Sequence, residues 1–235
     1  MKPLPRIDPK HFESIVFFTG AGMSAESGVP VYRGEGGIWN CYQWQEYACQ
    51  RAFDLDPEKV LDFHELRRKA VLQFQPHHGH EVIAQLQQQH PDVRVVTQNI
   101  DGMHQRAGSD NVIELHGSLW RVRCAEHGVN EDYGEQYNTR HCPYCGQWLR
   151  PDITWFEDML DTAVLQEMEA VMKRVRLFIC IGTSGVVYPA AVFPALARQV
   201  GATTVCINTE RPPDEDIFDV IIEEKAGDAL QRLFL

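Results

Sequence analysis

Six short apolar runs constrain the fold of this chain more than any other feature of its sequence. They cover residues 14–19, 93–97, 112–115, 177–181, 204–207 and 220–222. Between most of them lie amphipathic patterns that predict helices, at residues 81–89, 160–174, 190–200 and 228–234. Near-continuous apolar strands that alternate with helices are typical of a parallel sheet with both faces covered. The sequence therefore predicts an α/β fold built on a doubly wound, Rossmann-like parallel sheet.

Two segments do not follow this alternation. Residues 34–75 hold an aromatic loop and a helix that we expect to begin with Asp56 as its N-cap and Pro57 as its first residue. Residues 119–158 hold three cysteines and few strong strands. We expect both segments to form a smaller inserted module that is partly helical. Residues 1–33, 76–118 and 159–235 are then expected to form the domain of the parallel sheet.

Composition and charge exclude some classes of function. The chain has 235 residues and a net charge of −11, which disfavours nucleic-acid binding because phosphate affinity comes from clustered lysine and arginine. No run approaches the ~18 apolar residues that cross a membrane, and the first residues show no signal-peptide pattern. Seven cysteines, an odd number, fit a reducing compartment better than a disulfide framework. We therefore expect a cytoplasmic protein that binds neither nucleic acid nor membranes.

Polar and glycine residues follow most of the predicted strands at the point where each strand ends. Gly20-Ala21-Gly22 follows the first strand, where a tight turn and a close backbone approach suit a dinucleotide phosphate. The next glycine is Gly28, so the segment departs from the G-x-G-x-x-G pattern, and a purely structural turn stays open. The other strand ends carry Gln98-Asn99-Ile100-Asp101, His116, Gly182-Thr183-Ser184 and Asn208-Thr209-Glu210. Because the carboxyl ends of parallel strands share one edge of the sheet, we expect one cofactor site there.

With these segments in view, the chain resembles the sirtuins, a family of NAD-dependent protein-lysine deacylases, in their bacterial form and nearest the desuccinylase-like branch. The matching segments follow the order of the family and cover nearly the whole chain. They are G-A-G-M-S-A-E-S-G-V-P-V-Y-R-G at 20–34, T-Q-N-I-D-G-M-H at 97–104, E-L-H-G at 114–117, C-P-Y-C at 142–145, G-T-S at 182–184 and N-T-E at 208–210. The resemblance implies an enzyme that transfers the acyl group of a substrate lysine to ADP-ribose and releases nicotinamide.

The resemblance also implies roles for individual residues. His116 would be the general base, which suits a histidine because its ordinary pKa of ~6.5 leaves much of it neutral at pH 7. Asn99 and Asp101 would be catalytic by orienting the nicotinamide ribose. Arg33 can pair with phosphate through its planar fork, although an ordinary surface arginine is the alternative. The residues implied in NAD binding are Gly20, Ala21, Gly22, Glu26, Tyr32, Arg33, Trp39, Gln98, Asn99, Ile100, Asp101, Gly182, Thr183, Ser184, Asn208, Thr209, Glu210 and Ala226.

A pair of cysteines predicts a metal site in the second insertion. Cys142 and Cys145 have the spacing of half a zinc knuckle, and Cys124-Ala125-Glu126-His127 supplies the other half. We therefore expect one structural zinc on Cys124, His127, Cys142 and Cys145, because four protein ligands leave no position open for catalysis. His141 competes for the fourth ligand position, and a knuckle without metal also stays open. The remaining cysteines are expected to pack in the core: Cys41, Cys49, Cys180 and Cys206.

The resemblance places the acyl-lysine substrate near Ala52, His64, Arg67, Val186 and Val187. In the desuccinylase-like branch a Tyr-x-x-Arg pair binds the carboxylate of the acyl group, and here His64 replaces the tyrosine. Residues three apart share a helix face, so His64 and Arg67 could point into one pocket, although an exposed His/Arg face is the alternative. A loop that reads Phe-Gly-Glu in the family reads Phe156-Glu157-Asp158 here. We expect its extra negative charge to favour basic residues that flank the substrate lysine.

Other functions stay open at this point. An NAD-dependent protein mono-ADP-ribosyltransferase on the same scaffold would need an acceptor side chain that competes with the acyl oxygen. A non-catalytic NAD-sensing module predicts a damaged catalytic set, but Asn99, Asp101 and His116 are all present. The partners that we expect are proteins or peptides with acyl-lysine, and we expect the protein to work as a monomer.

Overall fold

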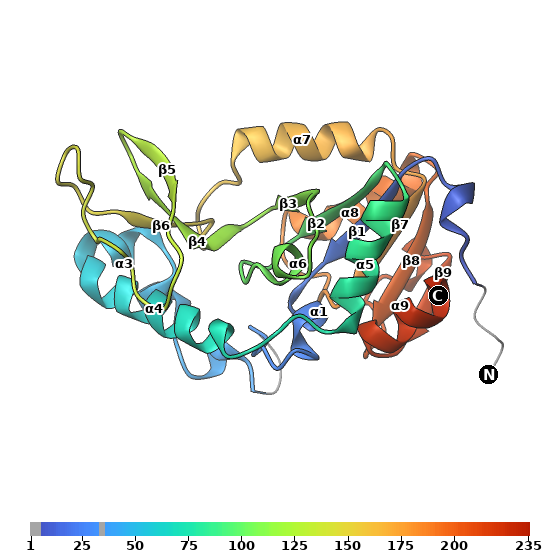
Figure 1. Ribbon diagram of the computed structural model, residues 1–235, viewed down its shortest axis with the longest axis horizontal. Coiled ribbons are helices and arrows are strands. Elements are labelled where there is room, and N and C mark those ends of the chain that lie inside the picture. Colours follow the sequence, from blue (N-terminus) through green and yellow to red (C-terminus); the bar gives the residue numbers. More distant parts are fainter. Residues whose placement is uncertain (1–5, 33–35) are drawn as a thin grey trace.

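The structure, a computed structural model, describes residues 6–32 and 36–235. Figure 1 shows an elongated molecule with a large sheet at one end and a smaller module, which has its own sheet, at the other. Arg33, for which the sequence predicts a phosphate contact, lies outside the described residues. A search of the described helices finds none that combines the length and apolar character needed to cross a membrane.

All strands of the large sheet run parallel. They lie in the order β3-β2-β1-β7-β8-β9, so the chain moves outward from β1 in one direction and then continues on its other side. This reversal is the topological switch of a doubly wound fold, beside which cofactors bind at the carboxyl ends of the strands. The strands are β1 (Ile15–Thr19), β2 (Val93–Thr97), β3 (Val112–Glu114), β7 (Leu177–Ile181), β8 (Thr203–Asn208) and β9 (Val220–Glu223). The predicted fold is confirmed, and each predicted strand agrees with these bounds to within one residue.

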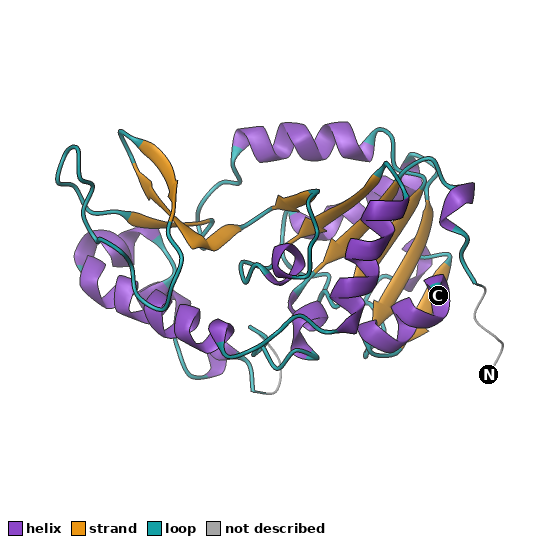
Figure 2. Ribbon diagram, in the orientation of Figure 1, coloured by secondary structure: helices purple, strands orange, loops and turns teal. Residues whose placement is uncertain are grey.

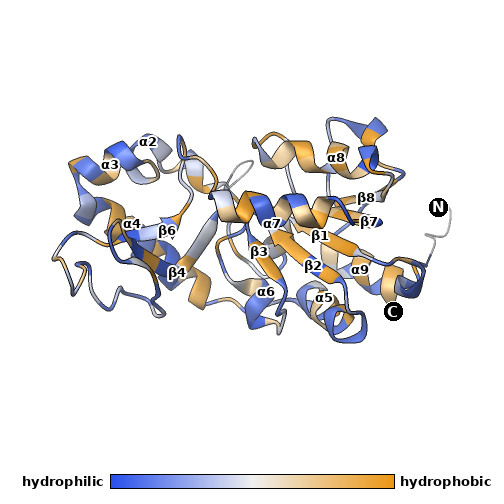
Figure 3. Cartoon of the chain, turned by 90° about the horizontal axis from the view of Figure 1, so that it is seen from above, coloured by the Kyte–Doolittle hydropathy of each residue, from blue (hydrophilic) through white to orange (hydrophobic). Residues whose placement is uncertain are grey.

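Alternate residues of the central strand face two separate cores. Ile15 and Phe17 of β1 pack beneath α5 (His78–Gln89) and α9 (Ala226–Phe234). Val16 and Phe18 pack beneath α7 (Thr162–Met172) and α8 (Phe193–Gln199). Helices therefore cover both faces of the sheet (Figure 2). Burial on both faces is the reason that β1, β2 and β3 are almost uniformly hydrophobic in Figure 3.

Caps and proline, rather than the apolar pattern, decide where several helices begin. α5 begins at His78, earlier than predicted, because the His77 side chain accepts a hydrogen bond from the Gly79 N–H. α7 begins directly after Asp161, whose carboxylate accepts two N–H groups of the first turn. The helix predicted at 190–200 is divided into a 3-10 turn, η3 (Ala190–Val192), and α8, because Pro194 lacks an N–H and fits only a first turn. α9 begins two residues earlier than predicted, at Ala226.

The smaller module combines short helices with an antiparallel sheet in the order β5-β4-β6. As predicted, Asp56 caps a helix whose first residue is Pro57, and its carboxylate accepts the Lys59 N–H at 3.0 Å. The elements are α2 (Trp44–Tyr47), α3 (Gln50–Leu55), α4 (Pro57–Leu72), β4 (Gly117–Cys124), β5 (Gly128–Glu131) and β6 (Arg150–Ile153). The structure forms β4, β5 and β6 in and around the segment where the sequence shows few strong strands. β5 is exposed along its length and β6 reads R-P-D-I, so neither shows an alternating apolar pattern.

The remaining elements are short. They are η1 (Pro9–His11), α1 (Ala21–Ala25), η2 (Ile38–Asn40), α6 (Met103–Arg106) and η4 (Glu215–Ile217). Of these, α1 and η2 both lie between β1 of the large sheet and α2 of the small module. The exact boundaries between the two parts of the chain stay a prediction.

A buried arginine joins α4 to the rest of the small module. Arg68 is fully buried, and its Nη2 donates to Asp132 Oδ1 at 2.8 Å. The guanidinium also lies over the Tyr137 ring, 4.4 Å from its centroid, and over the Trp120 ring at 5.5 Å. Removing one partner of a buried ion pair leaves the other charge uncompensated, which is strongly destabilising. This contact therefore fixes α4 against the segment that follows β5.

The turn after β6 holds a residue in an unfavourable backbone conformation. Glu157 has a φ of +71°, the one positive value among the described residues other than glycine. The turn is held by Asp158, whose carboxylate accepts the Trp155 N–H at 3.0 Å and pairs with Arg150. The charge of Asp158 is therefore neutralised within the protein. Of the two acids that we expected to face the substrate, Glu157 has 55% of its side chain exposed, against 17% for Asp158.

Replacing Glu157 with glycine is expected to stabilise the protein by about 1 kcal/mol, because glycine adopts the left-handed conformation without a clash of Cβ. The ion pair that is lost, with Arg51 at 3.9 Å, is exposed and contributes little. Urea unfolding of both proteins measures the difference. Glu157→Ala is the matched control, since it removes the same carboxylate and keeps Cβ. Equal stability of the glycine and alanine variants would contradict the backbone explanation.

Candidate active site and metal centre

Two glycine turns meet where the strand order reverses. The Gly22 N–H donates to the Gly182 carbonyl oxygen at 2.8 Å, and the Gly20 N–H donates to Ile181 O at 2.9 Å. A Cβ atom on Gly22 would lie 2.6 Å from the Gly182 Cα, and Gly182 itself has a φ of +58°. Only glycines allow the ends of β1 and β7 to approach this closely. The predicted turn after β1 therefore lies at the switch point, where a doubly wound fold binds its cofactor.

The residues after β2 are fixed against this turn. Asn99 is buried, and its Nδ2 donates to Gly20 O at 2.9 Å and to Ser24 Oγ at 3.2 Å. Asp101 is also buried, and its carboxylate accepts the Met103 N–H at 2.9 Å. Burial raises the pKa of Asp101, because a charged carboxylate is costly away from water. The structure thus brings Asn99 and Asp101 to the same end of the sheet as the glycine turn.

His116 is held in one orientation at the end of β3. Its Nδ1 lies 3.1 Å from the Gln98 carbonyl oxygen, which can only accept, so Nδ1 carries the proton of the neutral ring. The lone pair then lies on Nε2, for which the structure shows no hydrogen-bond partner among the residues that it describes. Burial lowers the pKa of His116 below its usual range, because the charged ring loses hydration. The arrangement suits a general base.

A narrow pocket joins the glycine turn, the β2 end and α4. Its volume is about 10 Å³, on the scale of a single water molecule. Arg67 lies against one wall, with its guanidinium 5.6 Å from the centroid of the Tyr32 ring. Its Nε has no hydrogen-bond partner among the described residues although it is buried. The pocket is lined by Ala21, Ser24, Val29, Pro30, Tyr32, Arg67, Val71, Asn99, Ile100, Asp101 and Leu119.

The pocket includes one polar residue that the sequence pattern did not single out. Ser24 is buried, receives the hydrogen bond from Asn99 and also contacts Asp101, where its hydrogen bond lowers the pKa of the carboxyl against the larger effect of burial. The available signal was its place four residues after Gly20 in the glycine-rich segment, because residues four apart lie on the same face of a helix such as α1. Ser24 therefore belongs to the candidate site.

The other residues implied in NAD binding lie around the same edge of the sheet. Gln98 Nε2 is buried without a hydrogen-bond partner among the described residues, which leaves a donor for a bound cofactor. Glu26 accepts the Gly227 N–H at 3.0 Å and so lies beside Ala226, the first residue of α9. Asn208 Nδ2 donates to Thr183 O at 3.3 Å, which links the ends of β7 and β8. Ser184, Thr209 and Glu210 are exposed.

The proposed partner of Arg67 in the acyl pocket is not placed as expected. His64 is buried, with Nδ1 donating to Val60 O at 2.8 Å and Nε2 accepting from Trp155 Nε1 at 3.2 Å. Burial lowers its pKa to about 4. Both ring nitrogens are therefore engaged, and His64 is wrongly predicted as a donor to the acyl group. The alternative of an exposed His/Arg face is also wrong, since His64 and Arg67 are both buried.

Of the other residues near which the resemblance places the substrate, Ala52 is buried in α3, whereas Val186 is 55% exposed in the loop after β7. Val187 follows in this loop, and its carbonyl oxygen accepts the Ala191 N–H at 2.8 Å. The structure places Arg67 in the narrow pocket and does not bring Val186 or Val187 into its lining.

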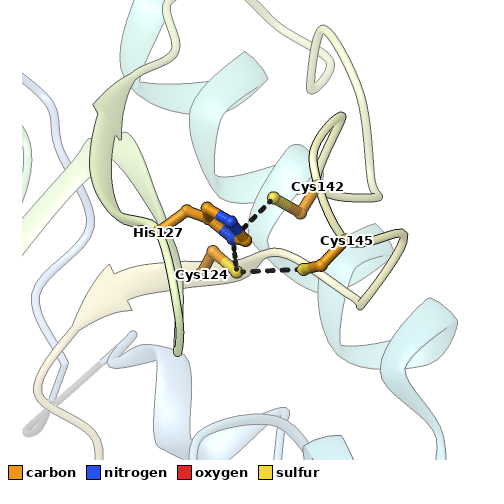
Figure 4. A group of neighbouring side chains, drawn as sticks. All are labelled: Cys124, His127, Cys142 and Cys145. Carbon is orange, nitrogen blue, oxygen red and sulfur yellow. Dashed lines mark hydrogen bonds between the residues drawn. The ribbon is translucent and has the colours of Figure 1, made fainter.

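Three cysteines and a histidine converge in the small module (Figure 4). Cys124 Sγ lies 3.6 Å from Cys145 Sγ, and His127 Nδ1 lies 3.6 Å from both Cys124 Sγ and Cys142 Sγ. Ligands at about 2.1–2.3 Å from one tetrahedral zinc are spaced by roughly 3.5–3.8 Å, so these atoms fit a structural zinc site. The hydrogen bond with His127 lowers the pKa of Cys124 to about 6, which favours the thiolate that binds metal.

The competing histidine and the other cysteines lie outside this cluster. His141 packs against Trp148, with ring centroids 4.1 Å apart. His127, as predicted, is therefore the residue that supplies the fourth possible ligand atom of the cluster. Cys49, Cys180 and Cys206 are buried as expected, but Cys41 is exposed, so its assignment to the core was wrong. Cys41 follows η2, and its position in an aromatic segment gave no pattern from which exposure could be predicted.

The fold and site together define a class of protein that has a doubly wound sheet, a glycine turn at its switch point, a histidine held at a strand end and an insertion with a zinc-knuckle cluster. Residues 20–189 match the Sir2 family. An NAD-dependent protein deacylase of Aquifex aeolicus is 40% identical over 227 residues, which cover 94% of this chain and 94% of that protein. The chain therefore belongs to the Sir2 family, and the resemblance to the sirtuins is confirmed.

Two solved structures extend the comparison. A Sir2 homologue in complex with NAD is 38% identical and has a TM-score of 0.86, covering 97% of this chain and 93% of that chain. A Sir2 variant with a deacetylated p53 peptide and 3′-O-acetyl-ADP-ribose is 30% identical and has a TM-score of 0.82, covering 95% of this chain and 93% of that one. The likeness therefore extends over both the large sheet and the small module.

From this cluster we expect one bound zinc ion per chain and a lower thermal stability of the protein when the zinc is absent. Cys142→Ser is expected to lose the metal and to lower the melting temperature by roughly 5–10 °C, because structural zinc contributes several kcal/mol to folding. Atomic-absorption and thermal unfolding measurements check both. His127→Cys is the matched control and should retain the zinc, since thiolate also binds it. Undiminished zinc affinity in His127→Ala would show that the fourth ligand is a different group.

Proposed function

We propose that this protein is an NAD-dependent protein-lysine deacylase in which His116 is the general base. The orientation of His116 carries the proposal, because the contact of Nδ1 with Gln98 O leaves the lone pair on Nε2. Asn99 and Asp101 lie in the pocket that begins at the glycine turn, so a base and two ribose-orienting side chains share one end of the sheet. The relatives known as NAD-dependent deacylases support the same assignment.

When bound, NAD supplies a nicotinamide leaving group and the ribose hydroxyl that receives the acyl group. The side chains of this chain then have distinct tasks. Asn99, held by Gly20 O and Ser24 Oγ, and Asp101, held by the Met103 N–H, orient the ribose. Tyr32, stacked on Trp39 at 5.8 Å, covers the pocket and excludes water.

His116 takes a proton through Nε2 from the ribose hydroxyl that attacks the acyl carbon. The proton on Nδ1 stays in its hydrogen bond with Gln98 O, so the ring becomes positively charged while its orientation is kept. Only the neutral ring can accept this proton. Because burial lowers the pKa of His116, the ring stays neutral to lower pH than an exposed histidine.

His116→Gln is expected to lower NAD-dependent deacetylation of an acetyl-lysine peptide at least about 100-fold, as loss of a general base does. In the unaltered protein kcat/KM should fall as the pH falls through a pKa below 6.5, since protonation removes the lone pair. Mass spectrometry of the peptide and nicotinamide follows the reaction. His78→Gln, an exposed histidine at the start of α5, is the matched control.

The outcomes separate the two functions that the sequence leaves open. Loss of the acyl group that depends on both NAD and His116 supports the deacylase. Release of nicotinamide with ADP-ribosylated protein, and with the acyl group intact, would instead support a mono-ADP-ribosyltransferase. The substrate class of acyl-lysine proteins or peptides belongs to this proposal, and the monomeric state and cytoplasmic location stay predictions.

We assign the recognition of an acidic acyl group to Arg67 alone, because both ring nitrogens of His64 already have hydrogen-bond partners. Arg67 lines the narrow pocket, has no ion-pair partner among the described residues and can offer two parallel donors to a carboxylate. Arg67→Met is therefore expected to lower kcat/KM for succinyl-lysine peptides at least about tenfold relative to acetyl-lysine peptides. Lys69→Met, an exposed cation on the same helix, is the control. Equal losses on both peptides would refute a role in reading the carboxylate.

A further inference from the structure

A second hollow lies on the small module, on the outer side of α4. It is open to solvent, has a volume of about 360 Å³ and is lined by residues of α2, the start of α4 and the segments before them. The residues are Tyr42, Tyr47, Asp56, Glu58, Lys59, Asp62, Phe63 and Leu66, which we call the aromatic hollow. Leu66 is 59% exposed and Tyr42 is 36% exposed, so the hollow presents apolar surface to water.

Three aromatic rings form one wall of this hollow. The Tyr42 and Phe63 centroids are 5.0 Å apart, those of Tyr47 and Phe63 are 4.9 Å apart, and the two tyrosine rings meet edge to face at 5.4 Å. The face of Tyr47 already carries a cation, because Lys59 Nζ lies 4.7 Å from its centroid. Lys59 also pairs with Glu46 at 2.6 Å. The rings therefore present a π face that attracts an ammonium group.

Carboxylates surround the rings on the side of α4. Asp56, Glu58 and Asp62 line the aromatic hollow, against the single cation Lys59. Asp62 is 63% exposed and pairs with Arg140, which Glu65 also binds. For Glu58 the structure shows no hydrogen-bond or ion-pair partner in the part of the chain that it describes. An excess of negative charge beside aromatic faces suits a cationic side chain and disfavours an apolar acyl chain or a phosphate.

The aromatic hollow is connected to the reaction pocket by stacked rings. Phe63 stacks on Trp39 with centroids 6.1 Å apart, and Trp39 stacks on Tyr32 at 5.8 Å. Tyr32 lines the narrow pocket, whereas Phe63 lines the hollow. α4 also contributes Arg67 to the narrow pocket and Leu66 to the aromatic hollow. The two sites are therefore close enough for one substrate protein to contact both.

We propose that the aromatic hollow binds a lysine or arginine side chain of the acyl-lysine protein substrate, at a distance from the acyl-lysine itself. The proposal rests on the proposed deacylase function. The carboxylates of the hollow favour an occupant with positive charge. We expect this cation to lie over an aromatic ring, as Lys59 lies over the Tyr47 ring. Lys59 competes for the same ring face, so its removal strengthens binding of the substrate cation.

The test uses acetyl-lysine peptides in an otherwise neutral background, with one arginine moved one position at a time along the peptide. Citrulline at the same position is the neutral control of equal shape. At the positions that reach the hollow, arginine is expected to lower KM roughly threefold to tenfold relative to citrulline, as a cation–π contact with nearby carboxylates does. The kcat value should not change, since the hollow does not contact the reacting atoms.

Variants connect this effect to the hollow. The double variant Glu58→Gln/Asp62→Asn should abolish the gain from arginine, and Lys59→Gln should increase it. Glu167→Gln, an exposed acid on α7, is the matched control and should leave the gain unchanged. A gain that persists in the double variant, or an arginine without effect at every position, would overturn the proposal while deacetylation of the neutral peptide leaves the proposed function standing.

Failure of the neutral peptide to react would count against the proposed function and still leave the hollow testable. Fluorescence anisotropy then compares a labelled arginine peptide without acyl-lysine on the unaltered protein and on the two hollow variants. Tighter binding to Lys59→Gln and weaker binding to the double variant support the hollow. Equal binding to all three proteins refutes it.

Discussion

The close contact of the glycine turns after β1 and β7 is the constraint on which the rest of the site depends. A side chain on Gly22 would meet the Gly182 backbone at 2.6 Å, so any larger residue must separate the two strand ends. The same turn holds Asn99 through Gly20 O. Separation at the switch point would therefore displace Asn99 as well as the glycine turn, and with them the groups to which we assign ribose and phosphate binding. Parallel strand order and glycine content act together here, because neither alone brings these backbones into contact.

His116 is held from both parts of the molecule. The large sheet supplies Gln98 O to its ring, and the small module supplies the Thr154 N–H, which donates to His116 O at 2.9 Å. A Cβ atom on Gly117 would lie 2.0 Å from Asp152 O, so the strand after β3 must pass close to β6. Arg121 reinforces the junction by pairing with Glu114 at 2.5 Å and with Asp152 at 2.9 Å. The orientation of His116 consequently depends on the position of the small module, in which Arg68 and Asp132 form a buried ion pair.

The sequence predicts the large sheet well because its strands carry apolar runs, which burial on both faces requires of the central strands β1 and β7. It predicts the small module poorly, since β5 is exposed along its length and β6 consists mainly of Arg150, Pro151 and Asp152, so neither strand carries an apolar run. In the site, His116, Asn99 and Asp101 could be found because glycine and polar residues end apolar strands. Ser24 was missed because it lies inside α1, and the burial of His64 was missed because Trp155, its partner, is 91 residues away in the chain.

The buried polar side chains of α4 differ in the partners that the protein gives them. Three neighbouring polar side chains of this helix, His64, Arg67 and Arg68, are buried. His64 is satisfied by Val60 O and Trp155, and Arg68 pairs with the carboxylate of Asp132, although its Nε and Nη1 have no hydrogen-bond partner among the described residues. Arg67 has no ion pair among the described residues, and its guanidinium interacts instead with Tyr32 and, over a longer range, with Asp101. Arg67 thus lines the narrow pocket without a carboxylate of the described residues to pair with, and this is the observation that supports its proposed role toward the carboxylate of an acyl group.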